Sequence, residues 1–447
     1  MGWLALSTAG AGAFAAERDE PGVARVSAIE GEASYFRSDG DDWTGVAVNA
    51  PLITGDRFYA GRDSRAEIQL APAIDARLGD TTELDMVELA PDATQVRLAL
   101  GHAVFRARRM DGRHFEVDTP AAAVVLDRGG TFRVDVDGDG RVTIGVREGE
   151  VAVHTRNGDA RLAAGRGEVL SADGDPLDSF ALGAPDALDS WEQARATRVD
   201  RAASYQYVSD QIYGGEDLDE YGTWDYRRGY GQVWRPTAVD PGWAPYSNGR
   251  WVWVAPWGWT WLDYAPWGWA PFHYGRWISL DDGWWWAPGP VIADPVYAPA
   301  LVAFYGYGLG GASVSVSIGI GPSIGWVPLG WGEPCLPWWG GWGGVRVGNP
   351  WWGGWGGPRI VNNVVINQTN IYKIHVDKIV FKNRDVPGGM SVVPQRSFLA
   401  GEDHRIRLHD ANLRDLRPID GRVPLTPDRA SLPSSPPSRV QVARDAI

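Results

Sequence analysis

The chain of 447 residues lacks the composition of several protein classes. Its single cysteine, Cys335, excludes an intrachain disulfide. Lys and Arg number 42 against 56 Asp and Glu, and the net charge of −14 disfavours nucleic acid, whose phosphates need a basic footprint. No segment after the N-terminus reaches the roughly 20 consecutive apolar residues of a membrane-spanning helix. The seven histidines have no spacing typical of a metal site, so we expect neither a metal nor a cofactor.

The N-terminal segment 1–16 is apolar and contains Ala13-Phe-Ala15, which is similar to the cleavage site of a secretory signal. A positively charged segment before it is missing, and we expect that the true start lies upstream or that a few residues are lost. An ordinary apolar strand or helix is the alternative. Because of this segment, we expect export to the periplasm or beyond the bacterial cell. No cysteine follows the segment, so we expect no lipid anchor at that site.

What the chain holds in excess is tryptophan, with 25 residues, of which 21 lie between Trp234 and Trp355. The sequence from Trp243 to Trp251, Trp-Ala-Pro-Tyr-Ser-Asn-Gly-Arg-Trp, recurs 26 residues later with Phe-His-Tyr in place of Tyr-Ser-Asn. A fixed period of this length indicates a supersecondary unit that is repeated to bury a shared core. We expect each repeat to hold two short aromatic strands.

The aromatic side chains of these repeats form two predicted groups. Alternate residues of a hairpin share one face, where cross-strand aromatic pairs add ~0.2–1 kcal/mol each. We therefore expect structural clamps at Trp251, Trp253, Trp259, Trp261 and Trp277. Side chains out of phase with these would stay exposed and stack on a sugar ring or dock an envelope protein. The candidates for this ligand-binding role are Trp257, Trp267, Trp285, Tyr246 and Tyr274.

The hydrophobic pattern predicts a fold that is mainly β. Period-2 alternation split by Gly, Asp and Pro predicts an N-terminal antiparallel β domain. A short helical linker, a Trp-rich β-hairpin repeat domain and a disordered C-terminal tail are expected to follow. The expected bounds are a signal-like segment at 1–16, the β domain at 23–172, a helical and acidic linker at 184–228, the repeat domain at 229–305, a Gly/Trp/Pro-rich segment at 306–358, a β-rich segment at 359–417 and the tail at 418–447.

Within the Gly/Trp/Pro-rich segment, Ser313–Ile318 alternates as a strand does, whereas Trp338–Pro358 is of low complexity and is expected to be mobile. The acidic residues Glu216, Asp217, Asp219 and Glu220 are expected to form part of the linker.

A series of short motifs runs through the N-terminal β domain. These are Gly31, Leu52-Ile-Thr-Gly-Asp56, Arg65-Ala-Glu-Ile-Gln-Leu70, Leu98-x-Leu-Gly-His-Ala103, Val117-Asp-Thr-Pro120, Gly129-Gly-Thr-Phe-Arg133 and Val146-x-x-Gly-x-Val151. With them, residues 23–172 resemble the FecR-type domain, a β-rich periplasmic module. FecR relays an outer-membrane signal to a cytoplasmic sigma factor, so the resemblance implies a signal-relay role as one alternative. A cytoplasmic segment and a membrane span upstream of Met1 would favour it.

The remainder of the chain, to about residue 417, carries a second set of motifs. Besides the Trp repeats these are Val233-Trp-Arg-Pro236, Ala298-Pro-Ala300, Gly325-Trp-Val-Pro-Leu-Gly330, Glu333-Pro334, Asn367-x-Thr-Asn-Ile371, Val386-Pro-Gly-Gly and Val392-Val-Pro394. This part resembles an uncharacterised bacterial Trp-rich family that commonly follows a FecR-type domain. That family has no assigned activity, so the resemblance implies none here.

Three motifs match functional patterns by their letters only. Asp135-x-Asp137-x-Asp139-Gly140 is similar to half of a calcium-binding EF-hand loop, but its twelfth position is Val146 instead of Glu and its flanks alternate as strands. Gly321-Pro-Ser323-Ile-Gly325 fits a nucleophile elbow, but a Pro-rich sequence follows it, where the elbow needs a helix. Gly306-x-Gly308-x-x-Gly311 precedes a strand instead of the helix that a dinucleotide site requires. We interpret all three as turns or strand ends.

The sequence therefore predicts a non-enzymatic envelope protein that binds or scaffolds, with a cell-wall polysaccharide or an envelope protein as its partner. A FecR-like relay component is the first alternative. A glycan-active enzyme is the second, because hydrolysis of a glycosidic bond needs two carboxylates and Asp263, Asp281 and Asp282 lie in the repeat block.

Overall fold

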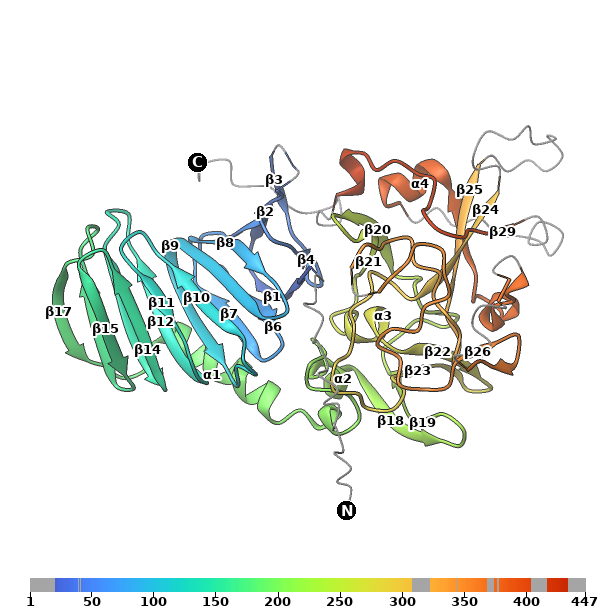
Figure 1. Ribbon diagram of the computed structural model, residues 1–447, viewed down its shortest axis with the longest axis horizontal. Helices are drawn as coiled ribbons and strands as arrows, with labels where there is room; N and C mark the ends of the chain where they lie inside the picture. The colour runs from blue at the N-terminus through green and yellow to red at the C-terminus, as the bar shows by residue number, and fades with distance from the viewer. Residues whose placement is uncertain are drawn as a thin grey trace, which may run out of the picture.

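The computed structural model describes residues 21–307 without 39 and 41, 322–367 without 343, 374–375, 378–402 and 416–432. Two β-rich domains lie side by side, the first in blue to green and the second in yellow to red (Figure 1). The predicted mainly β fold class is thus confirmed. The signal-like segment 1–16 and the predicted strand Ser313–Ile318 lie outside the described residues. No helix in the described ranges is long and apolar enough to cross a membrane.

The first domain consists of two layers of strands that share one long strand, β9 (Ala93–Ala107). The first half of β9 pairs in one layer and its second half, from Gly101 onward, pairs in the other. Gly101 has a φ of +100°, and a Cβ at this position would lie 2.4 Å from the hydroxyl oxygen of Thr82. Only glycine therefore fits where the strand passes from one layer to the other.

The strands of each layer follow one another in a simple order on both sides of β9. The layer that holds the second half of β9 contains β4 (Pro51–Leu52), β1 (Ala24–Glu30), β6 (Arg65–Ala71), β7 (Ile74–Leu78), then β9, β12 (Gly130–Val136), β13 (Val142–Glu148), β16 (Arg166–Leu170) and β17 (Pro176–Ala181). The other layer contains β3 (Trp43–Gly45), β2 (Ala33–Phe36), β5 (Arg57–Ala60), β8 (Thr82–Leu89), then β9, β10 (His114–Asp118), β11 (Ala123–Val125), β14 (Glu150–Thr155) and β15 (Gly158–Ala163).

Alternation along these strands produces the core of the first domain. Apolar residues such as Phe105, Phe115 and Phe132 point between the layers, where their rings lie 5.4–6.2 Å apart. The pairings are antiparallel as predicted, except that β10 runs parallel to β9. The last strand, β17, extends the β domain to Ala181, past the expected bound at 172.

The predicted helix is α1 (Ala187–Asp200), which begins at a capping box formed by Asp186 and Asp189. It lies along the first domain and leads to η1 (Ala203–Gln206) and α2 (Asp217–Tyr221) at the junction of the two domains (Figure 1). Within the acidic segment Glu216 and Asp217 are 1% and 4% exposed, whereas Asp219 and Glu220 are exposed. The carboxylates of Glu216 and Asp217 take part in a buried network described below.

The second domain consists of short sheets joined by loops. One sheet holds β18 (Gly222–Arg227), β19 (Gly231–Pro236), β23 (Gly283–Ala287) and β22 (Arg276–Leu280) in that order, and another holds β28 (Ser391–Pro394), β25 (Ser323–Pro328), β24 (Val302–Tyr307) and β29 (Arg417–Pro418). Two hairpins, β20 (Gly249–Val254) with β21 (Gly258–Asp263) and β26 (Ile360–Val361) with β27 (Val364–Val365), complete the strands. The helical elements are α3 (Ala270–His273), η4 (Lys382–Asp385), α4 (Gln395–Ala400) and η5 (Arg429–Ser431).

Segments that the sequence marks as mobile or disordered contribute to this domain. Within 338–358, Trp338, Trp339 and Trp352 are buried, and the backbone of Trp351 pairs with that of Cys335. Residues 418–432, the first part of the expected tail, also pack on the domain, because Leu425 is buried. The remainder of the tail, 433–447, lies outside the described residues.

Candidate functional site

The repeated Trp motif forms two hairpins with the same cross-strand pairing. In β20–β21, Trp251 lies opposite Trp261 and Trp253 lies opposite Trp259, with ring centroids 5.4 and 5.5 Å apart in edge-to-face geometry. In β22–β23, Trp277 lies opposite Trp286. This is the pairing that the alternation of the sequence predicts, and it follows from the period of two residues along a strand.

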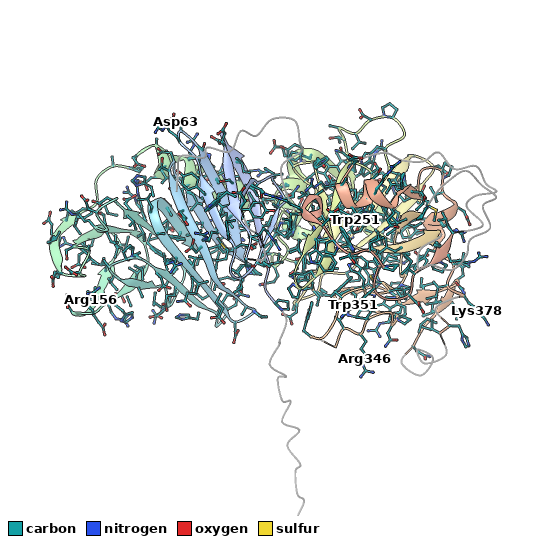
Figure 2. The ribbon with its side chains drawn as sticks, turned by 90° about the horizontal axis from the view of Figure 1, so that it is seen from above. Asp63, Arg156, Trp251, Arg346, Trp351 and Lys378 are labelled. Carbon is teal, nitrogen blue, oxygen red and sulfur yellow. The ribbon has the colours of Figure 1, made fainter. Side chains whose placement is uncertain are left out.

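Four of the five predicted clamps are almost completely buried. Trp251, Trp259, Trp261 and Trp277 are each 1–2% exposed, whereas Trp253 is half-buried. Trp251 also contacts Phe304 and Trp326 of the sheet that holds β24 and β25, Trp338 of a loop and Phe398 of α4. Figure 2 shows Trp251 among the side chains of the second domain, whereas Arg156 lies at the far end of the first. These tryptophans thus form the core of the domain.

The expectation that Trp257, Trp267 and Trp285 are exposed is wrong. They are 1%, 4% and 4% exposed. Trp257 follows the hairpin strand β20 and is covered by Tyr297 and Trp342, whose ring centroids lie 5.0 and 5.1 Å away. Residues far along the chain thus bury this side chain, and the local period of the hairpin carries no information about them.

The other two side chains of this group are buried by different partners. Trp267 packs against Trp234 and stacks on Phe272, at centroid distances of 5.1 and 5.8 Å. Trp285 lies on the opposite sheet face from its neighbours, as its phase predicts, but the guanidinium of Arg227 covers it at 4.4 Å. Its indole N–H donates to Asp282 Oδ1 at 2.9 Å. None of the three offers an open aromatic face.

The two tyrosines with a predicted ligand-binding role are buried as well. Tyr246 is 0% exposed, and its hydroxyl donates to the carbonyl of Phe272 at 2.7 Å and accepts from the backbone N–H of Leu301 at 2.9 Å. Burial also raises the pKa of Tyr246. Tyr274 is 7% exposed, and its carbonyl accepts from the indole of Trp286. Tyr246 therefore joins loops of the core, and neither ring is open to a ligand.

The motifs that resemble catalytic or metal-binding patterns lie in ordinary strands and turns. Ser323 opens the strand β25, and the residues after it continue as a strand, without the helix of a nucleophile elbow. Asp137 Oδ1 accepts from the backbone N–H groups of Asp139 and Arg141, and so closes the turn between β12 and β13. Within the described ranges, no group of three or more His, Cys, Asp or Glu side chains could hold a metal ion.

Two of the three carboxylates proposed for a glycan-active enzyme, Asp263 and Asp282, have structural partners, and Asp281 is exposed. Asp263 is 2% exposed, and burial raises its pKa to about 7. Its two carboxylate oxygens accept from the N–H of Ala265 and the indole of Trp261, at 2.9 and 3.0 Å. Asp282 pairs with Arg227 at 2.7 Å on the surface. The single thiol, Cys335, is fully buried, which raises its pKa to about 12.

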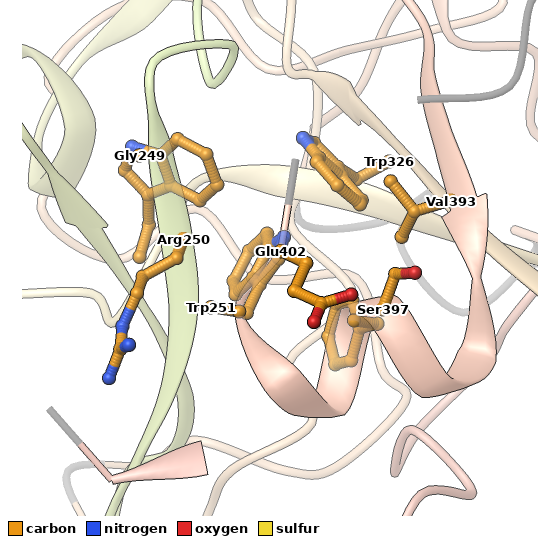
Figure 3. Close-up of a pocket in the computed structure, with 10 residues that line it drawn as sticks. Gly249, Arg250, Trp251, Trp326, Val393, Ser397 and Glu402 are labelled. Atoms are coloured by element: carbon orange, nitrogen blue, oxygen red, sulfur yellow. The ribbon is translucent and has the colours of Figure 1, made fainter. Parts of the chain in front are cut away.

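Two hollows bear on ligand binding. One, of about 20 Å³, lies between the Trp hairpin and α4 and is lined by Trp251, Trp326 and Phe398, with Ser397 and Glu402 at its side (Figure 3). This volume holds about one water molecule. The other, of about 340 Å³, is a shallow surface hollow whose wall includes the ion pair of Arg106 with Asp200. The aromatic hollow is thus too small for a sugar ring.

The junction of the two domains holds a polar cluster that the sequence did not single out. Arg25, in β1, is 0% exposed and donates to Asp217 Oδ2 at 2.6 Å and to the carbonyl of Pro266 at 3.1 Å. Asn49 donates to the carbonyls of Ala265 and Asp263 at 2.7 and 3.3 Å. Arg25 stands in an alternating strand at a position that would normally face water, so the sequence pattern does not predict that its side chain is buried.

The helix α1 docks on the first domain through charged side chains too. Glu67, in β6, accepts from Arg77 at 2.7 Å and from Arg195 at 2.6 Å, and Arg77 also donates to Glu192. These arginines lower the pKa of Glu67 although its burial opposes them. The linker is therefore tied to the face of β1, β6 and β7 by buried ion pairs.

Comparison with known proteins gives two matches to family models. Residues 56–152 match the model described as FecR protein, and residues 215–333 match a family of unknown function, DUF6600. No curated protein matches the chain.

Two crystal structures of a "putative anti-sigma factor" from Parabacteroides distasonis are similar to part of the chain. Both are 23% identical to it. The structure at 2.50 Å resolution has a TM-score of 0.26 and covers 28% of this chain and 59% of its own; the structure at 1.65 Å has a TM-score of 0.28 and covers 31% and 64%. The chain thus spans less than two thirds of either. The two family matches, in this order, confirm the predicted architecture of a FecR-type domain followed by a Trp-rich domain of an uncharacterised family.

Proposed function

We propose that the chain is a non-enzymatic regulatory component of the bacterial cell envelope, which acts through protein contacts of its FecR-type domain. The observation that carries this proposal is the match of residues 56–152 to the FecR model. Because FecR itself relays a signal, a relay or regulatory role has more support than the aromatic binding role that we first expected from the Trp repeats.

The burial of the candidate tryptophans also favours a regulatory role over a sugar-binding one. A lectin-like role would need open aromatic faces, and the candidate rings Trp257, Trp267 and Trp285 are covered. The Trp-rich domain then serves as a rigid body attached to the FecR-type domain. Contact with a cell-wall polysaccharide through these rings has no support among the described residues.

The surroundings of the titratable groups support a non-enzymatic role. Groups with large pKa shifts in the second domain, such as Asp263 and His273, are buried and bound to backbone or indole partners. A shifted pKa at a functional site usually accompanies an accessible cleft. Here the shifts arise from burial in the core, which favours a structural role for these side chains.

The localisation is part of the proposal. The apolar segment 1–16 with its Ala-x-Ala pattern favours export, and FecR-type domains are associated with the envelope. We place the mature chain in the periplasm or outside the cell, with an envelope protein as its partner.

Transcript profiling of a deletion strain tests the proposal. We expect loss of the chain to change the transcripts of a defined, sigma-factor-dependent set of genes, and we expect the full-length chain to restore them, with an empty vector as control. In parallel, crosslinking of the tagged chain in intact cells should capture an envelope protein. Unchanged transcripts, together with retention of the purified chain on peptidoglycan, would contradict the regulatory role.

A further inference from the structure

The outer face of β1 and β6 has the polarity of a surface but is buried. Arg25 lies opposite Gln69 in the pairing of these strands, and both side chains point away from the apolar core between the layers. In an isolated antiparallel domain such a face would meet water. Here Arg25 and Gln69 are 0% and 5% exposed, because α2 and a loop of the second domain cover them.

The contacts across this junction converge on Arg25. The guanidinium of Arg25 donates to Gln69, Asn49 and Asp217 at the same time, at 2.6–3.0 Å. A residue with an uncharged side chain would therefore not replace Arg25 easily. Gln69 in turn donates to Glu216 at 2.8 Å. Arg25 of the first domain thus shares the carboxylate of Asp217 with Arg198 of α1, which donates to Asp217 Oδ1 at 2.8 Å, and reaches Glu216 through Gln69.

The loop 263–266 of the second domain presents backbone carbonyls to the same arginine and its neighbour. Pro266 faces Arg25, while the carbonyls of Asp263 and Ala265 face Asn49. The carboxylate of Asp263 holds the N–H of Ala265 and so fixes the shape of the loop. Arg25, Asn49 and Gln69 of the first domain thus donate every one of these hydrogen bonds to α2, to its N-cap residue Glu216 and to the loop.

The buried apolar residues of the two domains form one continuous cluster, and the Arg25 network is a polar part of the contact between them. Interfaces between domains that move are more polar than permanent ones, so this polar part is the place where a change in docking would act. Removing one partner of a buried ion pair leaves an uncompensated charge, which strongly favours an open state in which water reaches that charge. Burial already raises the pKa of Glu216, which the nearby charge of Arg25 opposes.

We propose that Arg25 is a latch that determines whether the Trp-rich domain docks on the FecR-type domain, with Asn49 as its second contact. Opening the latch separates α2 and the loop 263–266 from β1 and β6 while both domains stay folded. This inference goes beyond the proposed function, because docking is a property of the purified chain and needs no partner.

Hydrogen exchange of the full chain tests the latch. Arg25→Ala removes the charge, and Asn49→Gly removes the amide contacts while tolerating the φ of +68° at this position. The matched control is Arg65→Ala, which breaks an ion pair with Glu30 on an exposed part of β6. We expect Arg25→Ala and Asn49→Gly to speed exchange in 203–221 and 258–268 about tenfold or more, and Arg65→Ala to leave it unchanged.

Exchange in β12 and β13 distinguishes opening from unfolding. These strands lie in the first domain away from the junction, and their amides should keep wild-type protection in both variants. Unchanged exchange in 203–221 and 258–268 would overturn the proposal. Loss of protection in β12 and β13 in both variants would also overturn it, because Arg25 and Asn49 would then serve to fold the first domain.

Discussion

Trp251 lies directly opposite Trp261 in the hairpin β20–β21, with the two ring planes at 67° to each other. Trp277 and Trp286 repeat this pairing in the next hairpin. The repeated motif of the sequence thus encodes a repeated pair of buried rings. Each pair belongs to a continuous aromatic core, which explains why so many tryptophans occur together and why the candidates Trp257, Trp267 and Trp285 have no open face.

Truncation of one of these rings should destabilise the second domain. Trp251→Ala leaves a cavity among five aromatic neighbours, and we expect it to lower the free energy of unfolding by ~3–5 kcal/mol. Trp253→Ala, two residues along the same strand, is the control, and should cost less because Trp253 is half-buried. Chemical denaturation followed by circular dichroism measures both. Equal, wild-type-like stability of the two variants would contradict a core role for Trp251.

The hydroxyl of Tyr246 should contribute to stability through its two backbone partners. Tyr246→Phe leaves the carbonyl of Phe272 and the N–H of Leu301 without this partner inside the core. We expect a loss of ~1–3 kcal/mol in the free energy of unfolding. Tyr226→Phe, at a position that is 66% exposed, should change it little. If both variants melt at the wild-type temperature, the hydroxyl of Tyr246 does not stabilise the core.

Asp263 and His273 should give opposite pH dependences of stability. The folded pKa of Asp263 is about 7, above the ordinary 3.8, so its contribution falls as the pH rises from about 4 to 7 and then stays level. Burial lowers the pKa of His273 from 6.5 to about 3, so its contribution is complete above 6.5 and is lost as the pH falls towards 3.

Urea unfolding at several pH values separates the two groups. Relative to wild type, the Asp263→Asn variant should gain free energy of unfolding as the pH rises to 7, by about 4 kcal/mol at most. Relative to wild type, the His273→Gln variant should lose free energy of unfolding as the pH rises from 3 to 6.5. A difference between Asp263→Asn and wild type that does not vary with pH would contradict the raised pKa of Asp263.

Cys335 should be unreactive in the native chain. Its thiol is fully buried and its pKa is about 12, so almost no thiolate exists at pH 8. A thiol reagent such as Ellman's reagent should therefore label the chain only after unfolding in urea, when its single cysteine becomes accessible. Rapid labelling of the folded chain would show that the loop around Cys335 opens.

The sequence predicts local structure well where a side-chain period decides it. Alternation identifies the strands of the first domain, and the repeat predicts the opposition of Trp251 and Trp261. The same reasoning fails for Trp257, because Tyr297 and Trp342 cover it from segments that lie far along the chain. Long-range packing of this kind leaves no trace in a local period.

The domain junction shows a second limit of sequence reasoning. Arg25 occupies a strand position that normally faces solvent, and Glu216 and Asp217 stand in an acidic segment that the sequence predicts only as a linker. Only the docking of the second domain buries all three and brings their charges together. Polar residues are mostly exposed in proteins, so a buried ionic interface contradicts the usual rule and cannot be derived from it.

Acrylamide quenching of tryptophan emission, with and without peptidoglycan, distinguishes a tryptophan core from a tryptophan binding surface. If these tryptophans form a core, their emission should be blue-shifted, acrylamide should quench it poorly, and peptidoglycan should not change it. A red-shifted emission that acrylamide quenches strongly and that bound peptidoglycan protects would show that the tryptophans are not a core and would restore the aromatic repeats as a binding surface.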